Sequence, residues 1–159
     1  MKKALTITLV CSLIIGTTKL SCGQNISDTQ KAKIEKEVDS AFHQMIKIAE
    51  NVNYDLLNIG VDDSRNAGFI VNGQYFAQYD SLISNLKSRA QNLAKQSINV
   101  KKEKITVLAD NIALLTAFGD SSVELTTGNA FNVRFYWSFV YVKENGAWKV
   151  IQSHQSGAR

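Results

Sequence analysis

The segment FNVRFYWSFVY, residues 131–141, alternates between two kinds of side chain and decides the fold class. The odd positions are apolar or aromatic and the even positions are mixed: Phe131, Val133, Phe135, Trp137, Phe139 and Tyr141 against Asn132, Arg134, Tyr136, Ser138 and Val140. Successive side chains of a strand point to opposite faces, so this period predicts a strand that buries its odd face against helices. The even face is left for solvent or for a partner subunit.

The period of two extends to both sides of this segment. It predicts four long strands, at Val100–Ala109, Ile112–Thr126, Phe131–Lys143 and Trp148–Ser156. Their connections are short and rich in turn residues: Asp110-Asn111, Thr127-Gly128-Asn129 and Asn145-Gly146. Short connections join antiparallel neighbours, so the C-terminal half is predicted to be a meander.

The N-terminal half has a helical period instead. Apolar residues recur every three or four positions over Ser27–Val52, at Ile34, Val38, Phe42, Met45, Ala49 and Val52. Tyr54–Ile59 predicts a further helical turn or two, Ala67–Phe76 two short extended pieces about Asn72-Gly73, and Tyr79–Lys95 a second helix. Helices followed by a meander of strands predict an α+β fold, with the helices on one face of a curved antiparallel sheet.

Residues 1–23 are predicted to be a signal peptide. Lys2 and Lys3 precede a short apolar run, Ala4–Gly16, and Ser21 and Gly23 have the small side chains of a cleavage site. The run is too short for a membrane-spanning helix. Alternatively, Cys22 resembles the acylated cysteine of a bacterial lipoprotein. Both readings predict export, with residues 24–159 as a single periplasmic or secreted domain, anchored to a membrane only if Cys22 is lipidated.

Charge and cysteine content narrow the function classes. Cleavage after residue 23 removes three of the 18 basic residues and none of the 14 acidic ones, so the net charge falls from +4 to +1. With one solvated basic run, Lys101-Lys102-Lys104, a nucleic-acid partner is not expected. Both cysteines, Cys11 and Cys22, lie in the leader, so no disulfide or thiol chemistry is expected in the mature domain.

The closing segment GAWKVIQSHQSGA, residues 146–158, and the order of elements before it resemble the nuclear transport factor 2-like superfamily. More narrowly, residues 27–158 resemble the SnoaL-like domains, and the ending Trp148…His154-Gln155-Ser156-Gly157-Ala158 is similar to the end of the calcium/calmodulin-dependent kinase association domain. The resemblance implies helices packed in a cone on a strongly curved sheet, the cystatin-like α+β roll. It also implies a pocket open at one end and dimerisation through the outer sheet face.

Members of this superfamily include isomerases, cyclases, dehydratases and non-catalytic binding or assembly domains, and fold alone does not choose among them. The enzymes typically use an acidic residue that projects into the pocket. No acidic residue of this chain can be matched to such a position, which favours binding over catalysis.

Two residues are candidates for a general base. His154 can accept or donate a proton near neutral pH, and the resemblance places it near the mouth of the cone. A two-residue turn at Asn145-Gly146 puts His154 opposite Trp137 on the aromatic face, whereas a three-residue bulged loop puts it opposite Tyr136 on the mixed face. Asp55 is the second candidate. The alternative reading, which fold-level considerations favour, is that His154 is a hydrogen-bonded residue at a strand end or subunit interface.

Five residues are predicted to contact a ligand: Tyr54, Arg134, Tyr136, Trp137 and Phe42. Arg134 could anchor a carboxylate or form an ion pair on the outer sheet with Glu124. Trp137 and Phe42 could line the pocket or belong to the core. Asp39 and His43, one helical turn apart, are interpreted as a solvated surface pair. No metal or cofactor is expected, since metal-binding, phosphate-loop and nucleophile-elbow motifs do not occur.

These observations lead to one main hypothesis and two alternatives. The main hypothesis is an exported SnoaL-like domain that binds a small, mostly apolar molecule in a cone-shaped pocket, as a homodimer. The first alternative is a metal-free lyase or isomerase in which His154 or Asp55 is the general base. The second is a non-catalytic oligomerisation module whose pocket is vestigial.

Overall fold

The computed structural model describes residues 26–158, so the predicted signal peptide and Cys22 lie outside the described residues. Helix α1 (Asp28–Glu50) begins after Ser27, whose hydroxyl accepts a hydrogen bond from the backbone N–H of Gln30 at 3.2 Å. One face of the helix is buried, at Ile34, Val38, Phe42 and Ile46. No helix of the described part is long and apolar enough to cross a membrane.

The end of α1 differs from the sequence prediction. Val52 was expected to continue the apolar stripe, but the helix stops at Glu50 and Val52 adopts a left-handed backbone conformation with φ of +56°. Its N–H bonds to the carbonyl oxygen of Ala49, and the N–H of Asn53 bonds to that of Ile48. These bonds satisfy the last carbonyl groups of α1. The chain then enters the short helix η1 (Tyr54–Gly60).

Six strands form one sheet in the order β2-β1-β6-β5-β4-β3. Their bounds are β1 (Phe69–Val71), β2 (Gln74–Phe76), β3 (Leu93–Ala109), β4 (Ile112–Leu125), β5 (Ala130–Glu144) and β6 (Ala147–Ala158). The four long strands pair antiparallel, as the short connections predicted. The sheet is nevertheless mixed, because β1 of the small hairpin pairs parallel with β6.

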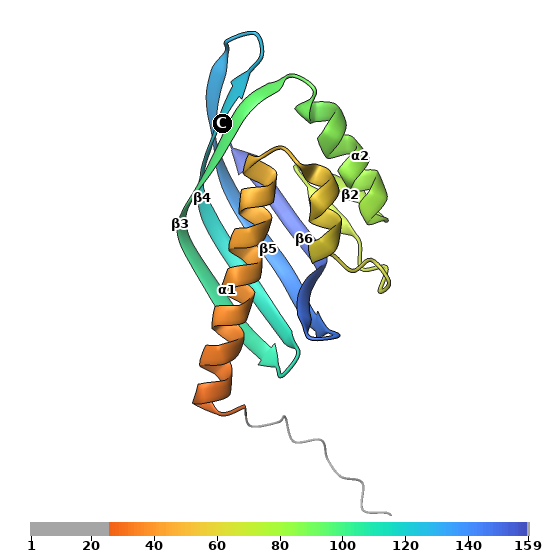
Figure 1. Cartoon of the computed structure of the whole chain (residues 1–159), viewed down its shortest axis with the longest axis vertical. Coiled ribbons are helices and arrows are strands. Elements are labelled where there is room, and N and C mark those ends of the chain that lie inside the picture. Colours follow the sequence, from red (N-terminus) through yellow and green to blue (C-terminus); the bar gives the residue numbers. More distant parts are fainter. Residues whose placement is uncertain (1–25, 159) are drawn as a thin grey trace, which may run out of the picture.

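The helices cover the concave face of this curved sheet (Figure 1). Helix α1, orange, runs along the face formed by the long strands, while η1 and helix α2 (Tyr79–Ala90) lie beside its C-terminal half. The core lies between these layers, and its largest fully buried side chains are Phe42, Phe69, Phe139, Tyr141 and Leu82. The predicted α+β class and the packing of helices on a curved sheet are confirmed.

The second helix is shorter than predicted. It ends at Ala90 rather than Lys95, and β3 begins at Leu93 rather than Val100. The added residues pair with the far half of β4, for example Ile98 with Ser121. The helical spacing of apolar residues continues to Leu93, but Leu93 already pairs with Leu125 of β4. Strand pairing here overrides a weak local preference for helix.

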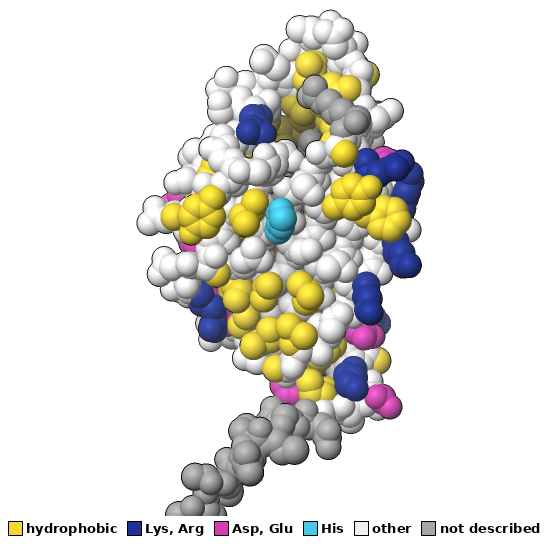
Figure 2. Space-filling view, turned by 180° about the vertical axis from the view of Figure 1, so that it is seen from behind, with side chains coloured by type: hydrophobic (Ala, Val, Ile, Leu, Met, Phe, Trp, Pro, Cys, Tyr) yellow, Lys and Arg dark blue, Asp and Glu magenta, His cyan; other side chains and the backbone are white. Residues whose placement is uncertain are grey.

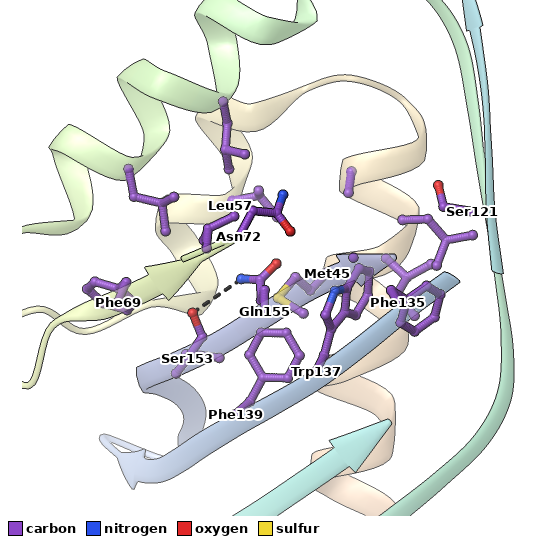
Figure 3. A pocket seen from close by; sticks show the side chains of 18 of the residues that line it. Met45, Leu57, Phe69, Asn72, Ser121, Phe135, Trp137, Phe139, Ser153 and Gln155 are labelled. Carbon is purple, nitrogen blue, oxygen red and sulfur yellow. Dashed lines mark hydrogen bonds between the residues drawn. The ribbon is translucent and has the colours of Figure 1, made fainter. Parts of the chain in front are cut away.

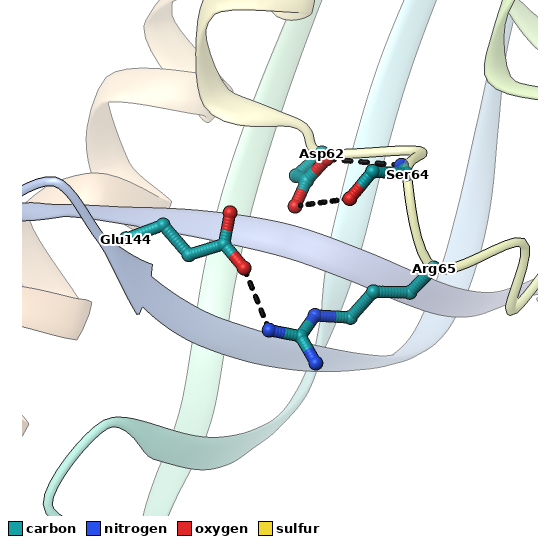
Figure 4. A network of polar contacts seen from close by, with 4 residues as sticks. All are labelled: Asp62, Ser64, Arg65 and Glu144. Atoms are coloured by element: carbon teal, nitrogen blue, oxygen red, sulfur yellow. Dashed lines mark hydrogen bonds and ion pairs between the residues drawn. The ribbon is translucent and has the colours of Figure 1, made fainter.

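The loop after η1 is fastened at two points. Asp62 accepts hydrogen bonds from the backbone N–H and the hydroxyl of Ser64, at 3.0 and 3.1 Å, and the first of these chiefly holds the pKa of Asp62 below its usual value. Arg65 pairs with Glu144 of β5 at 2.6 Å (Figure 4). Next to them, Asp63 accepts a hydrogen bond from the N–H of Tyr79 at 2.7 Å, so it caps α2, which lacks a cap of its own.

The turn between β5 and β6 contains two residues, with Glu144 paired to Ala147. Farther along, the register shifts, because Tyr141 pairs with Val150 whereas Val140 pairs with Gln152. This bulge moves His154 opposite Ser138, a pairing that neither predicted turn produces. The side chain of His154 is therefore exposed on the outer sheet face, the face that Figure 2 shows.

Candidate functional site

A cavity of about 260 Å³ lies on the concave side of the sheet, between the helices and the strands. Helix α1 contributes Met45 and Ala49, η1 contributes Leu57, and α2 contributes Leu82 and Leu86. Amphipathic spacing turns these apolar residues toward the sheet. The volume lies just below the range common for ligand pockets, about 300 Å³ upward.

Aromatic side chains of β5 form the sheet wall of this cavity. Phe135 and Trp137 stack with ring centroids 3.9 Å apart, and Trp137 meets Phe139 edge to face at 6.1 Å. All three lie on the odd-numbered face of β5, and Phe135 and Phe139 are buried. The sequence prediction that this face meets the helices is confirmed. The rings present a flat apolar surface suited to contact with a ligand that contains rings.

Polar groups project into the cavity from a few places. The amide Nε2 of Gln155 donates to the hydroxyl of Ser153 at 3.2 Å, and Asn72, from the turn after β1, lies on the adjacent edge (Figure 3). Tyr54 and Gln96 contribute a phenol and an amide. These groups donate and accept hydrogen bonds without carrying charge.

Charged side chains are missing from the described lining of the cavity: none of its residues is Asp, Glu, Lys, Arg or His. Tyr54 and Tyr79 are its ionisable groups, and burial raises the pKa of both phenols above the ordinary value. Both stay protonated at neutral pH and can donate a hydrogen bond. The cavity thus offers apolar contact and neutral hydrogen bonds but no carboxylate or imidazole to move a proton.

Two of the predicted ligand-contacting residues, Tyr54 and Trp137, line this cavity. Phe42 does not: its side chain is fully buried in the core and packs on Phe139, with ring centroids 5.8 Å apart. Asp55 does not line the cavity either. Its side chain is 71% exposed and pairs with Lys87 of α2. The predicted general bases Asp55 and His154 therefore lie apart from the cavity and from each other.

Arg134 and Tyr136 point to the outer face of the sheet, as even-numbered residues of β5. Arg134 pairs with Asp120 of β4 at 3.2 Å, and Asp120 also pairs with Lys101. The arginine is thus in an ion pair, but with Asp120 rather than with the expected Glu124. Tyr136 is half exposed and stacks on Phe118, with ring centroids 6.3 Å apart.

Sequence reasoning missed Asn72, Ser153 and Gln155 as candidate contacts. Ser153 and Gln155 flank His154 in a strand, so they face the side of the sheet that His154 does not. Alternation predicts that Ser153 and Gln155 share one face and His154 the other. Which face is which depends on the bulge in β6, which the sequence analysis did not predict. Asn72 was assigned only a turn role, which its φ of +50° confirms.

Helices that pack in a cone on a curved sheet and enclose an apolar cavity define a nuclear transport factor 2-like fold. A family model described as SnoaL-like domain matches residues 38–159, so the chain belongs to the SnoaL-like domain family. The predicted family and superfamily are confirmed.

Solved structures agree with this fold. A nuclear transport factor 2-like superfamily protein from Salmonella enterica serovar Typhimurium superimposes with a TM-score of 0.73 at 15% identity, covering 81% of this chain and 94% of that chain. A putative scytalone dehydratase from Novosphingobium aromaticivorans gives 0.73 at 10% identity, covering 84% and 89%. A putative calcium/calmodulin-dependent protein kinase II association domain from Xanthomonas campestris gives 0.64 at 17% identity, covering 77% and 86%. No curated protein matches the sequence.

Proposed function

We propose that this protein binds a small, uncharged and largely apolar molecule in the cavity between α1, α2 and the sheet. One observation carries the proposal: the cavity is walled by aromatic and aliphatic side chains and by neutral amides and hydroxyls, with no charged side chain in its described lining. A buried charge on the ligand would lose its hydration without gaining a partner there. The ligand is expected to stack a ring on Trp137 and to hydrogen-bond with Gln155.

The composition of the cavity favours binding over the lyase or isomerase alternative. Acid–base catalysis needs a group within hydrogen-bonding reach of the proton that it moves. His154 lies on the opposite face of the sheet, and Asp55 is exposed in its ion pair with Lys87. A structural relative named as a putative scytalone dehydratase shares the fold, but at 10% identity it lends no reaction to this chain.

The proposal is tested with three compounds that share one bicyclic skeleton: 1-tetralone, the hydrocarbon tetralin and the anion tetralin-1-carboxylate. The protein has two tryptophans, so Trp148→Phe leaves Trp137 as the single reporter of binding. Calorimetry measures affinity, while quenching of Trp137 emission locates the ligand. We expect 1-tetralone to bind at least tenfold more tightly than the carboxylate, because the cavity offers the anion no partner.

A matched variant shows whether the compounds enter this cavity. Ala49→Phe places a ring in the space from the side of α1 and removes none of the polar groups. It should abolish 1-tetralone binding while the far-ultraviolet circular dichroism spectrum stays unchanged. Equal binding of the ketone and the carboxylate, or unchanged binding by Ala49→Phe, would refute the proposal.

We further propose that the domain forms a homodimer through its outer sheet face. Phe118 and Tyr136 stack on that face and are 37% and 50% exposed, and together with His154 they border a shallow hollow. Apolar side chains gathered on an exposed sheet favour burial against a second copy. Sedimentation velocity should give the mass of a dimer for the wild type and of a monomer for Tyr136→Glu; a wild-type monomer contradicts the proposal.

Export remains part of the proposal and rests on the leader sequence. The intact mass of protein recovered from the cell envelope tests it. A chain that begins at Gln24 indicates a soluble exported protein, whereas an acylated Cys22 indicates a membrane anchor. An unprocessed chain in the cytoplasm contradicts export.

A further inference from the structure

A second group of polar side chains lies outside the cavity, where α1 crosses the edge strand β3. Asp39 and His43 are one turn apart on α1 and share a face of the helix. Glu103 comes from β3 and lies on the same face of the strand as the inward-facing Ile105 and Val107. One donor atom from each of the three residues lies within 4.8 Å of the other two.

The imidazole of His43 lies between the two carboxylates. Its Nδ1 is 3.2 Å from Oδ1 of Asp39 and 3.1 Å from the backbone oxygen of the same residue. Its Nε2 faces Oε2 of Glu103 at 3.9 Å. Among the described residues, neither carboxylate pairs with a lysine or arginine, so the imidazole of His43 is the only basic side chain paired with either of them.

The oxygen of Glu103 that faces His43 is unusually placed. Oε2 is shielded from solvent and receives no hydrogen bond within the described part of the chain. A buried carboxylate oxygen without a donor is costly unless a proton or a cation compensates it. Burial first, and the Asp39 carboxylate next, raise the pKa of Glu103 to about 7.

We propose that Asp39, His43 and Glu103 bind a divalent metal ion of the zinc class. One imidazole nitrogen and two carboxylate oxygens, with water in the open position, form a donor set that Zn²⁺, Co²⁺ or Ni²⁺ accepts. Mg²⁺ and Ca²⁺ prefer oxygen ligands alone and more of them, so the imidazole disfavours these ions. The proposal is independent of the cavity, which none of the three residues lines.

The side chains must rearrange to hold the ion, because Asp39 faces Nδ1 of His43 and Glu103 faces Nε2, and one ion binds only one of these nitrogens. Bond lengths of about 2.0–2.1 Å place two tetrahedral donors roughly 3.4 Å apart. The 3.9 Å between Nε2 of His43 and Oε2 of Glu103 must therefore shorten by about half an ångström. The side chains of His43 and Asp39 are 48% and 46% exposed, so an ion can enter from solvent. The bound metal would fasten α1 to β3, the edge strand of the sheet.

The test uses the full chain without an affinity tag, stripped of metal with EDTA and exchanged into metal-free buffer. ZnCl₂ is titrated by calorimetry, and Co²⁺ binding is followed by its visible absorption. We expect one ion per chain, a thermal midpoint raised by several degrees in 100 µM Zn²⁺, and weaker binding below pH 6, where protons compete for the ligands.

The two histidines of the chain provide a matched comparison. His43→Gln should abolish binding, Glu103→Gln should weaken it at least tenfold, and His154→Gln should bind like the wild type. Circular dichroism confirms that each variant is folded. If the wild type shows no saturable binding at 100 µM, or if His43→Gln and Glu103→Gln bind as well as His154→Gln does, the proposal is overturned and the cluster is an ion-pair network only.

Discussion

Gln155 and His154 are neighbours in β6 but project to opposite faces of the sheet, Gln155 opposite Trp137 in the cavity wall and His154 opposite Ser138 on the outside. The two hypotheses therefore involve different residues: ligand binding in the cavity involves Gln155, whereas acid–base catalysis involves His154. A ligand in the cavity can reach the amide of Gln155, whereas the sheet itself stands between it and the imidazole of His154.

Substitutions at these neighbours should therefore have different effects on binding. Gln155→Leu should weaken the binding of 1-tetralone about tenfold, because a hydrogen bond worth roughly 1–1.5 kcal/mol is lost, and should leave the affinity for tetralin nearly unchanged. His154→Ala should change neither affinity by more than about twofold. Calorimetry with both compounds measures the difference. A large loss in His154→Ala alone would argue for the acid–base alternative.

The left-handed conformation of Val52 makes a prediction for stability. A β-branched side chain is strained at a φ of +56°, a conformation that asparagine tolerates much better. Val52→Asn should raise the free energy of unfolding by about 1 kcal/mol. Val52→Ala, which shortens the side chain but retains a Cβ in the same conformation, should gain less. Chemical denaturation compares the two, and a destabilised Val52→Asn would show that packing of Val52 outweighs the backbone strain.

Asp63 provides the cap that α2 lacks locally. Asp63→Ala removes the acceptor for the N–H of Tyr79 and should lower the free energy of unfolding by about 1 kcal/mol. Asp63→Asn retains an oxygen that can accept this bond and should lose much less. Because α2 carries Leu82 and Leu86 of the cavity wall, Asp63→Ala should also weaken 1-tetralone binding. Equal stability of both variants would contradict a capping role.

Close backbone contact at Gly119 makes a third prediction for stability. A Cβ at this position would lie 2.0 Å from the backbone oxygen of Asn99 and 2.7 Å from the ring of Phe135. Gly119→Ala should therefore push β3 away from β4 and cost about 1–3 kcal/mol. Gly128→Ala is the control for backbone strain without a steric contact, because its φ is +83° but its Cβ would meet no atom within 4 Å. A smaller loss in Gly119→Ala than in Gly128→Ala would contradict the contact.

The raised pKa of Glu103 predicts how the stability of the metal-free protein depends on pH. In the unfolded chain this carboxyl group has its ordinary pKa of 4.5, whereas in the folded protein its pKa is about 7. Between these values unfolding releases a proton, so the contribution of Glu103 to stability falls as pH rises through this window. Asp39 and His43 face the same group: the carboxylate of Asp39 raises the pKa of Glu103 and the imidazole of His43 lowers it.

Glu103→Gln removes this titration. In EDTA, its stability relative to the wild type should increase from pH 4.5 to pH 7 and then become constant. Urea denaturation at several pH values measures the difference. Parallel stability profiles of the two proteins would show that the pKa of Glu103 is not raised in the folded state.

Local patterns predicted most of the elements of this fold. The strict alternation of residues 131–141 identified the buried face of β5, and short turns identified its antiparallel neighbours. The parallel pairing of β1 with β6 depends on contacts between Phe69–Val71 and Ser153–Gln155, far apart in sequence, and no local pattern encodes it. The start of β3 at Leu93 was not predicted for the same reason, because it depends on pairing with β4 and not on a local pattern.

The candidate site was only partly predictable for a related reason. Aromatic alternation pointed to Trp137, but the register shift near Val140 decides which of His154 and Gln155 faces the cavity. A bulge changes the face of every later residue in the strand, and the turn at Asn145-Gly146 gives no sign of it. His154 was predicted as a general base from its residue type and from the family resemblance, whereas the face it occupies depends on a bulge that neither of these reveals.

The central claim is that the cavity holds a small uncharged molecule, and native mass spectrometry of protein purified gently from its own cell envelope tests it most directly. We expect the wild type to retain one small neutral molecule per chain and Ala49→Phe, purified in parallel, to retain none. A wild-type protein without any bound molecule, or a molecule retained equally by Ala49→Phe, would contradict the account.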